Sequence, residues 1–392
     1  FRGAETVLAL VPEKRLKAGW LGESVAQPWC ALLEKAAEKE EAGPQGKTLV
    51  LLNPEKGPAR IVLGLLPDEV SRHNCPARAD AVFQAAAAAG LGGQTVAVIA
   101  CLDEDDHALP VARAVARALP LYSRKSTKPT KAKKGARKAK PKLSFFAMDG
   151  EGCAVAVSKA DREIVERSRW AAELVDKPTA EMTTADFEKA VRKAARTLEH
   201  VRVKAITGPA LLEKGLGGIH AVGRTATVAP RMVLIEYRPP KAKQHVGLVG
   251  KGVVYDTGGL SLKSSAGMSG MKCDMGGAAA AAGAALAIAA SKIKTSVTCA
   301  LPLAENAIGP KAYRPDDILT MHSGKTVEIN NTDAEGRLLL GDAVSYVSRR
   351  YKVDAVIDAA TLTGAVVIST GIRHAGVVSN REGLEQLAVT VG

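Results

Sequence analysis

Residues 249–263 read Val-Gly-Lys-Gly-Val-Val-Tyr-Asp-Thr-Gly-Gly-Leu-Ser-Leu-Lys, and residues 271–277 read Met-Lys-Cys-Asp-Met-Gly-Gly. The apolar run that leads into the first stretch is typical of a buried strand, and the glycines that follow predict turns in which backbone approaches a ligand closely. Four charged residues among these glycines stand out, namely Lys251, Lys263, Asp256 and Asp274. Charges are costly to bury unless opposite charges or metal ions compensate them. The stretch therefore predicts a charged site beside a buried strand.

A second acidic motif, Asn-Asn-Thr-Asp-Ala-Glu-Gly-Arg, occupies residues 330–337. Asp333 and Glu335 are two residues apart, and on an extended segment this spacing directs both carboxylates to the same side. With Asp256 and Asp274 they make four carboxylates, enough for two divalent ions that generate hydroxide and polarise a carbonyl group. The alternative is a structural cluster of salt bridges at strand ends. We favour the metal site because glycines and charges coincide in both stretches.

The length of 392 residues predicts two or three domains. Short apolar runs alternate with helical patterns in the first third of the chain, which indicates a small α/β domain over residues 1–155. Buried strands and long helical patterns recur in the remainder, with a turn at 215–218, and indicate a larger α/β domain over residues 156–392. The predicted fold class is α/β, with a small N-terminal domain and a larger C-terminal domain built on a mixed sheet.

The net charge of +13 is concentrated in one segment, residues 124–142, which holds ten basic residues and no acidic residue and leaves +3 for the rest of the chain. A like-charge block with prolines and no apolar periodicity is typical of a disordered linker. Such a segment could bind nucleic acid through phosphate contacts. We favour a solvated linker, because no aromatic side chains interleave the charges to stack on bases.

Other classes of protein are disfavoured by absent patterns. The six cysteines are scattered without a Cys-x-x-Cys pair, which indicates reduced thiols and a cytoplasmic protein. No His-Glu-x-x-His motif supports a histidine-zinc hydrolase. We find no apolar run of about 18 residues and no secretory signal, so no membrane association is expected.

The blocks at 251–263, 271–277 and 331–337 resemble the leucyl aminopeptidase (cytosol aminopeptidase) family of dimetal exopeptidases, in which the last block is diagnostic. The resemblance covers residues 150–392, and the N-terminal half is most similar to the subgroup termed probable aminopeptidase-like. It implies a catalytic domain that, in the family, continues beyond the equivalent of Gly392. It also implies a cytoplasmic homohexamer that acts on peptides.

For the metal site, the resemblance implies that Asp256 and Glu335 bridge two divalent ions. Lys251 and Asp274 would complete one site and Asp333 the other. Zn or Mn is the expected metal, with Mg or Co as alternatives. Lys251 can bind a metal only as a neutral amine, which burial beside dications would enforce.

For catalysis, the resemblance implies that Lys263 polarises the scissile carbonyl and that Arg337 holds a bicarbonate serving as general base. Met271 would line the pocket for the first side chain, and Thr361 and Leu362 would contact the substrate backbone.

The predicted function is therefore that of a metal-dependent aminopeptidase, in which a metal-bridging water attacks the peptide carbonyl and releases the N-terminal amino acid. Two alternatives stay open. One is a nucleic-acid-binding or regulatory protein that keeps the aminopeptidase scaffold, motivated by residues 124–142. The other is a two-metal phosphoesterase, because oxygen ligands also suit Mg or Mn.

Overall fold

The computed structural model describes residues 3–19, 29–52, 57–71, 73–125 and 142–392. The chain forms two compact units, Phe1–Val165 and Glu166–Gly392. Apart from its ends, the basic segment at 124–142 lies outside the described residues, and the linker and nucleic-acid predictions for it stay predictions.

The N-terminal unit is built on a six-stranded mixed sheet with the order β2-β3-β1-β4-β5-β6. Its strands are β1 (Thr6–Pro12), β2 (Lys47–Leu52), β3 (Arg60–Leu66), β4 (Val96–Cys101), β5 (Leu143–Met148) and β6 (Ala154–Val155). The four central strands are parallel, and the edge strands β2 and β6 are antiparallel to their neighbours. These strands lie where short apolar runs occur in the sequence.

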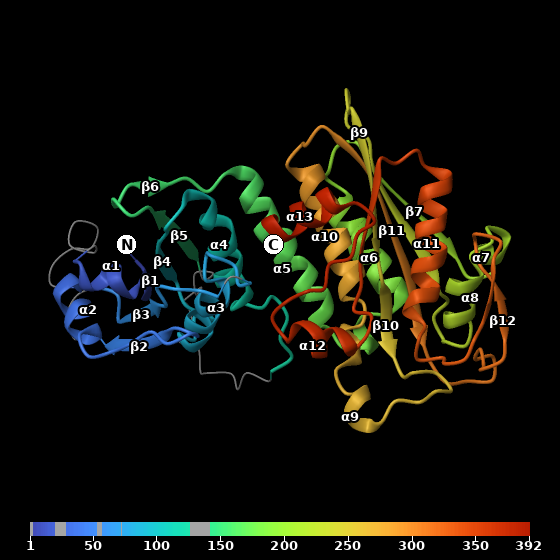
Figure 1. Ribbon diagram of the computed structural model, residues 1–392, viewed down its shortest axis with the longest axis horizontal. Helices are drawn as coiled ribbons and strands as arrows, with labels where there is room; N and C mark the ends of the chain where they lie inside the picture. The colour runs from blue at the N-terminus through green and yellow to red at the C-terminus, as the bar shows by residue number, and fades with distance from the viewer. Residues whose placement is uncertain (1–2, 20–28, 53–56, 72, 126–141) are drawn as a thin grey trace, which may run out of the picture. The chain divides into compact units, whose positions relative to one another are not determined.

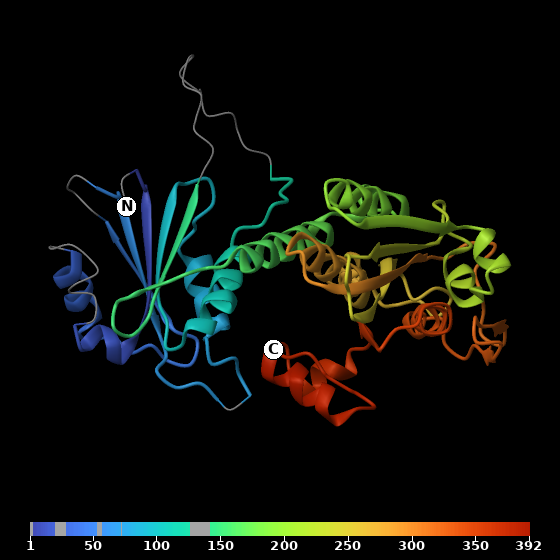
Figure 2. The same cartoon turned by 90° about the horizontal axis from the view of Figure 1, so that it is seen from above.

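Both faces of this sheet are covered by helices (Figure 2). Because side chains alternate along a strand, Leu8 and Leu10 of β1 pack into one core while Val7 and Ala9 pack into the other. The helices of the first core are α3 (Ala79–Ala88) and α4 (Ala108–Arg117), and those of the second are α1 (Glu13–Lys17) and α2 (Trp29–Ala37). A strand buried on both faces explains why β1 reads as a continuous apolar run.

The C-terminal unit is built on a second mixed sheet with the order β14-β9-β11-β8-β7, in which β10 also pairs with β11. Figure 1 labels β7, β9, β10 and β11 of this sheet. Its strands are β7 (Val201–Thr207), β8 (Arg231–Tyr237), β9 (Gln244–Gly250), β10 (Gly252–Asp256), β11 (Thr295–Asn306) and β14 (Ala355–Ala359). β9, β10, β11 and β14 run parallel, whereas β7 and β8 are antiparallel to their neighbours. A separate hairpin joins β12 (Ile318–Thr320) and β13 (Thr326–Glu328).

Helices again cover both faces of this sheet. One core contains α5 (Lys159–Asp176), α6 (Thr184–Ala195) and α10 (Gly276–Ala290). The other contains α7 (Ala210–Glu213), α8 (Gly217–Gly223) and α11 (Gly336–Arg350). The remaining helices are α9 (Ser265–Met268), α12 (Ala365–Thr370) and α13 (Glu382–Val391). The two-domain α/β prediction with a mixed C-terminal sheet is confirmed.

One stretch, Ser265–Ala290, is long and apolar enough to cross a membrane by length and composition alone. The expectation that no such run exists is therefore wrong by that measure. Two thirds of its most apolar window is buried inside the unit, where α10 packs against β9 and β11. This burial is what a core helix of an α/β unit shows.

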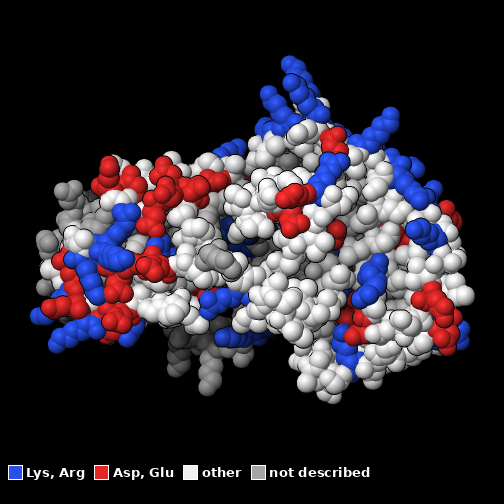
Figure 3. Space-filling model, viewed as in Figure 1, with Lys and Arg blue, Asp and Glu red and all other residues white. Residues whose placement is uncertain are grey.

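The last thirty residues carry many exposed apolar side chains. Ile368, Ile372 and Val378 are almost fully exposed, and no residue of α12 or α13 is buried. The surface over α12 is accordingly without charge in Figure 3.

Candidate metal centre

Three of the predicted site residues, and one polar residue that was not predicted, lie where the parallel strands of the C-terminal sheet end. Lys251 follows β9, Asp256 is the last residue of β10, Asn306 is the last residue of β11, and Thr361 lies two residues after β14. Asp256 and Asn306 are direct partners in the β10–β11 register. The carboxyl ends of parallel strands share one edge of a sheet, which is where open α/β sheets place their ligands.

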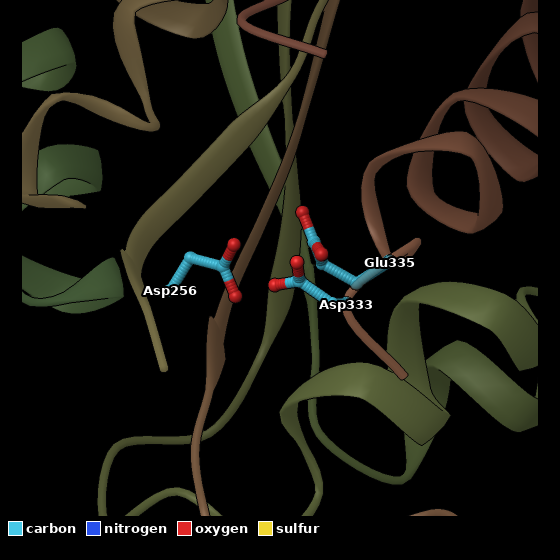
Figure 4. Close-up of side chains that lie close together, drawn as sticks. All are labelled: Asp256, Asp333 and Glu335. Carbon is cyan, nitrogen blue, oxygen red and sulfur yellow. The ribbon is translucent and has the colours of Figure 1, made fainter. Parts of the chain in front are cut away.

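Three carboxylates converge at this edge. One oxygen from each of Asp256, Asp333 and Glu335 lies within 4.8 Å of the other two, and Figure 4 shows the three groups facing one another. The extended segment predicted for Asp333 and Glu335 is not present. Asp333 lies in a turn, and Glu335 has helical backbone angles at the N-cap of α11. The turn, rather than strand alternation, brings both carboxylates to the same side.

Lys251 lies between the carboxylates of Asp274 and Glu335. Its Nζ donates to both oxygens of Asp274 at 2.7 Å and to the carbonyl of Thr361 at 2.7 Å, and lies 3.0 Å from Oε1 of Glu335. Only 2% of the side chain is exposed. A Cβ at Gly336 would lie 2.5 Å from Cε of Lys251, so only a glycine at this position leaves room for the lysine side chain.

Lys263 joins the other two carboxylates. Its Nζ lies 2.9 Å from Oδ2 of Asp256 and 2.5 Å from Oδ1 of Asp333. Although burial disfavours the ammonium form, hydrogen bonds to Asp333 and Asp256 raise the pKa of Lys263 well above its ordinary value. Each ammonium group of the centre thus lies between two carboxylates.

The centre does not balance its own charge. Four carboxylates face two ammonium groups, a difference of −2, at residues that are mostly buried. Burial raises the pKa of Glu335 to about 7 and raises that of Asp274, and Lys251 offsets this only in part. Burial alone would lower the pKa of Lys251, but the negative charges of Glu335 and Asp274 outweigh burial and raise that pKa.

The donors present fit a pair of divalent cations. Among the described residues, the buried Oε2 of Glu335 has no hydrogen-bond partner, although a carboxylate oxygen without one is costly to bury. The set consists of hard carboxylate oxygens and one nitrogen, which suits Zn, Mn, Mg or Co. Added dications would supply the positive charge that the cluster lacks.

The remaining predicted residues differ in how closely they approach the cluster. Thr361 is part of it, because its hydroxyl also donates to Oδ1 of Asp274 at 2.9 Å. Leu362 is 43% exposed and borders Gly336. Met271 is half-buried in the 3-10 helix η4 (Met271–Cys273). Arg337 is exposed and, among the described residues, forms no hydrogen bond or ion pair.

Three buried polar residues that were not predicted, Asn306, Tyr313 and Thr332, hold the acidic segments together. Asn306 donates from Nδ2 to Oδ1 of Asp256 at 2.8 Å, and Tyr313 donates to the carbonyl of Thr332 at 2.6 Å. The position of Asn306 beside Glu305 at the end of an apolar strand was an available signal. No local pattern distinguishes Tyr313 or Thr332.

Two family models match the chain. The catalytic domain of the cytosol aminopeptidase family matches residues 169–392, and the M17 aminopeptidase N-terminal domain 2 matches residues 30–128. Among curated relatives, "Probable aminopeptidase NPEPL1" of Mus musculus is 41% identical over 329 residues, or 83% of this chain and 62% of that protein. "Leucine aminopeptidase 1" of Caenorhabditis elegans is 42% identical over 231 residues, or 59% of this chain and 47% of that protein.

Solved structures agree with these matches. The leucyl aminopeptidase from Trypanosoma brucei in complex with bestatin has a TM-score of 0.85 and 36% identity, covering 98% of this chain and 74% of that one. The bottromycin maturation enzyme BotP in complex with Mn has a TM-score of 0.69 and 28% identity, covering 94% and 75%. The chain spans 62% of the length of the NPEPL1 relative. On the sequence match over more than half of its residues, the chain belongs to the cytosol aminopeptidase family.

Proposed function

We propose that this chain carries the metal centre of an aminopeptidase and takes part in releasing N-terminal amino acids from peptides. The observation that carries the proposal is the convergence of Asp256, Asp333 and Glu335, with a buried Glu335 oxygen left without a partner among the described residues. Family membership supports the same reaction class, and the T. brucei relative, an aminopeptidase in complex with bestatin, has the same fold.

We assign five residues to two divalent cations: Asp256 and Glu335 to both, Lys251 and Asp274 to one, and Asp333 to the other. The observed pairing of Lys251 with Asp274, and of Asp256 with Asp333 through Lys263, supports this division. When bound, such ions lower the pKa of water and polarise a carbonyl group. Lys251 would serve as a neutral amine, giving up the proton that it now shares with two carboxylates.

Lys263 is the residue we assign to the substrate carbonyl. Its ammonium group now neutralises Asp256 and Asp333, and it becomes free to turn once other positive charge neutralises them. A charged donor aimed at a developing oxyanion contributes about 3–4 kcal/mol to the transition state.

The substrate contacts follow from exposure. Arg337 presents an exposed guanidinium at the start of α11, which can hold a bicarbonate through two parallel hydrogen bonds, and the bicarbonate would accept the proton of water. Half-buried Met271 and exposed Leu362 offer apolar surface for the first side chain and the peptide backbone. We further propose the cytoplasmic homohexamer that the family resemblance implies, which size measurement in solution would test.

Metal content and turnover test the proposal together. The wild-type protein, loaded with Mn²⁺ or Zn²⁺, is expected to cleave leucine p-nitroanilide and to leave p-nitrophenyl phosphate intact. The variants Asp256→Asn and Glu335→Gln are expected to lose both bound metal, measured by mass spectrometry, and activity. Cleavage of the phosphoester alone would favour the phosphoesterase, and full activity in metal-free variants would contradict the assignment.

A further inference from the structure

A buried polar residue, Thr332, joins the two segments that carry the acidic residues. Its hydroxyl donates to the carbonyl of Gly258 at 2.6 Å and accepts from the amide of Ser261 at 2.7 Å. Its own amide donates to the hydroxyl of Ser261 at 3.1 Å. The loop between Asp256 and Lys263 is thereby bonded to the turn that carries Asp333.

The carbonyl of Thr332 accepts two further hydrogen bonds from residues outside both segments. The hydroxyl of Tyr313 donates at 2.6 Å, and Nδ2 of Asn306 donates at 3.0 Å. Asn306 donates from the same nitrogen to Oδ1 of Asp256. Because both neighbours of that nitrogen are acceptors, the orientation of the amide is fixed.

The hydrogen bonds to the Thr332 carbonyl act directly beside the acidic residue Asp333. The Thr332 carbonyl belongs to the peptide group that leads directly into Asp333, so its direction sets where the Asp333 side chain begins. Tyr313 and Asn306 are 1% and 0% exposed, so both donors are shielded from bulk solvent. Burial also keeps the Tyr313 hydroxyl protonated, because it raises the pKa of that group.

We propose that Tyr313 and Asn306 are positioning residues of the metal centre. They hold the Thr332–Asp333 peptide against the end of β10, so that the carboxylates of Asp256 and Asp333 converge before any cation binds. Asn306 bonds the proposed ligand Asp256 directly, and Tyr313 acts through the peptide group that leads into Asp333. Removing a residue that hydrogen-bonds to a metal ligand typically changes metal affinity or activity 10–100-fold. The inference rests on the proposed function, because it takes Asp256 and Asp333 as ligands.

The alternative is that Tyr313 serves only the hydrophobic core, in which its ring lies. The variant Tyr313→Phe keeps the ring and removes only the hydroxyl group. Tyr351→Phe is a matched control, because the Tyr351 hydroxyl donates a comparable 2.7 Å bond to Glu236, whose side-chain partners within the described part of the chain are Tyr351 and Lys204 and not the acidic cluster. A purely structural role predicts similar behaviour of the two variants.

The test measures Mn²⁺ affinity of the full chain by isothermal titration calorimetry, together with the electron paramagnetic resonance spectrum of bound Mn²⁺. We expect Tyr313→Phe to bind Mn²⁺ about 10–100-fold more weakly with an altered spectrum, and Tyr351→Phe to match the wild type. Asn306→Leu is expected to weaken binding as well, and the double variant less than additively, since both donors act on one carbonyl.

Mn²⁺ affinity and spectrum that are unchanged in Tyr313→Phe would overturn the positioning role. If the wild type binds Mn²⁺ and cleaves the aminoacyl substrate while Tyr313→Phe and Tyr351→Phe behave alike, the inference fails and the proposed function stands. A wild-type protein that binds no Mn²⁺ would overturn both.

Discussion

Replacing Lys251 by Met removes the positive charge at the most enclosed point of the centre. The ammonium group contacts three carboxylate oxygens within 3.0 Å and one carbonyl, with 2% of the side chain exposed. Methionine matches the apolar stem but leaves Asp274 and Glu335 facing each other without a counter-charge. Removing one partner of a buried ion pair costs about 3–5 kcal/mol. With a urea dependence of about 3 kcal/mol/M for a unit of this size, the midpoint should fall by roughly 1–2 M.

The assay is urea denaturation of the metal-free protein. Unfolding is monitored by hydrogen–deuterium exchange of peptides from α10, which report on the C-terminal unit. Lys292→Met is the matched control, because Lys292 pairs with Glu199 at 3.0 Å while both side chains are about 70% exposed. Exposed pairs contribute little, so the control midpoint should equal that of the wild type. A Lys251→Met midpoint equal to the control would refute the reasoning that this ammonium compensates buried carboxylates.

Three further predictions follow from single residues. Burial raises the pKa of Asp342 to about 6 from its ordinary 3.8, so the folded state binds the proton more tightly, and this residue should lower stability by about 3 kcal/mol as the pH rises from about 4 to 6. Glu335 and Asp274 also have raised pKa values, so the loss of stability measured by urea denaturation should be smaller in Asp342→Asn by about 3 kcal/mol; equal losses in the two proteins would contradict the role of Asp342. Gly336→Ala places a methyl group 2.5 Å from Cε of Lys251 and should weaken Mn²⁺ binding about tenfold or more. Gly341→Ala on the same helix is the control, because its methyl group meets only the flexible end of a methionine at 3.3 Å and Mn²⁺ binding should be normal. Equal affinities in the two variants would show that Gly336 is not needed to make room for the Lys251 side chain. Lys263→Ala should lower kcat by about 10²–10³-fold with bound metal retained, and an unchanged kcat would exclude its oxyanion role.

Strands buried on both faces were the most predictable part of the fold. Every residue of β1 is buried, and the last four residues of β9 are buried as well, so these stretches of the sequence are almost continuously apolar. Glycine-rich segments were the least predictable. The turn expected at 215–218 is present at Gly215, but Gly217 and Gly218 begin the helix α8. In this helix Gly218 and Gly223 lie against the Leu338 carbonyl and Pro230, where a side chain would clash. Glycine serves close packing there, and local propensity does not reveal it.

The site shows the same division between local and distant causes. Asp256, Asp274, Asp333 and Glu335 could be singled out because charges among glycines are conspicuous in a sequence. Their geometry could not be derived, since the turn at Asp333 is fixed by Tyr313 and Asn306, which lie more than fifteen residues away. The buried carboxylate of Asp342 was also missed, although an acidic residue on the apolar stripe of α11 was a readable signal.

The charge balance of the centre distinguishes its two original interpretations. A structural salt-bridge cluster is stable when each buried charge has a partner, because the desolvation of two ions is repaid only by close pairing with satisfied hydrogen bonds. Here Lys251 is shared between Asp274 and Glu335, and Lys263 between Asp256 and Asp333, so each ammonium serves two carboxylates. Two dications, with Lys251 neutral and Lys263 still charged, would change the sum from −2 to +1 and place cations against every carboxylate. A cluster selected for stability alone would carry two more basic residues or two fewer acids, and the deficit is what a pair of divalent ions is suited to fill.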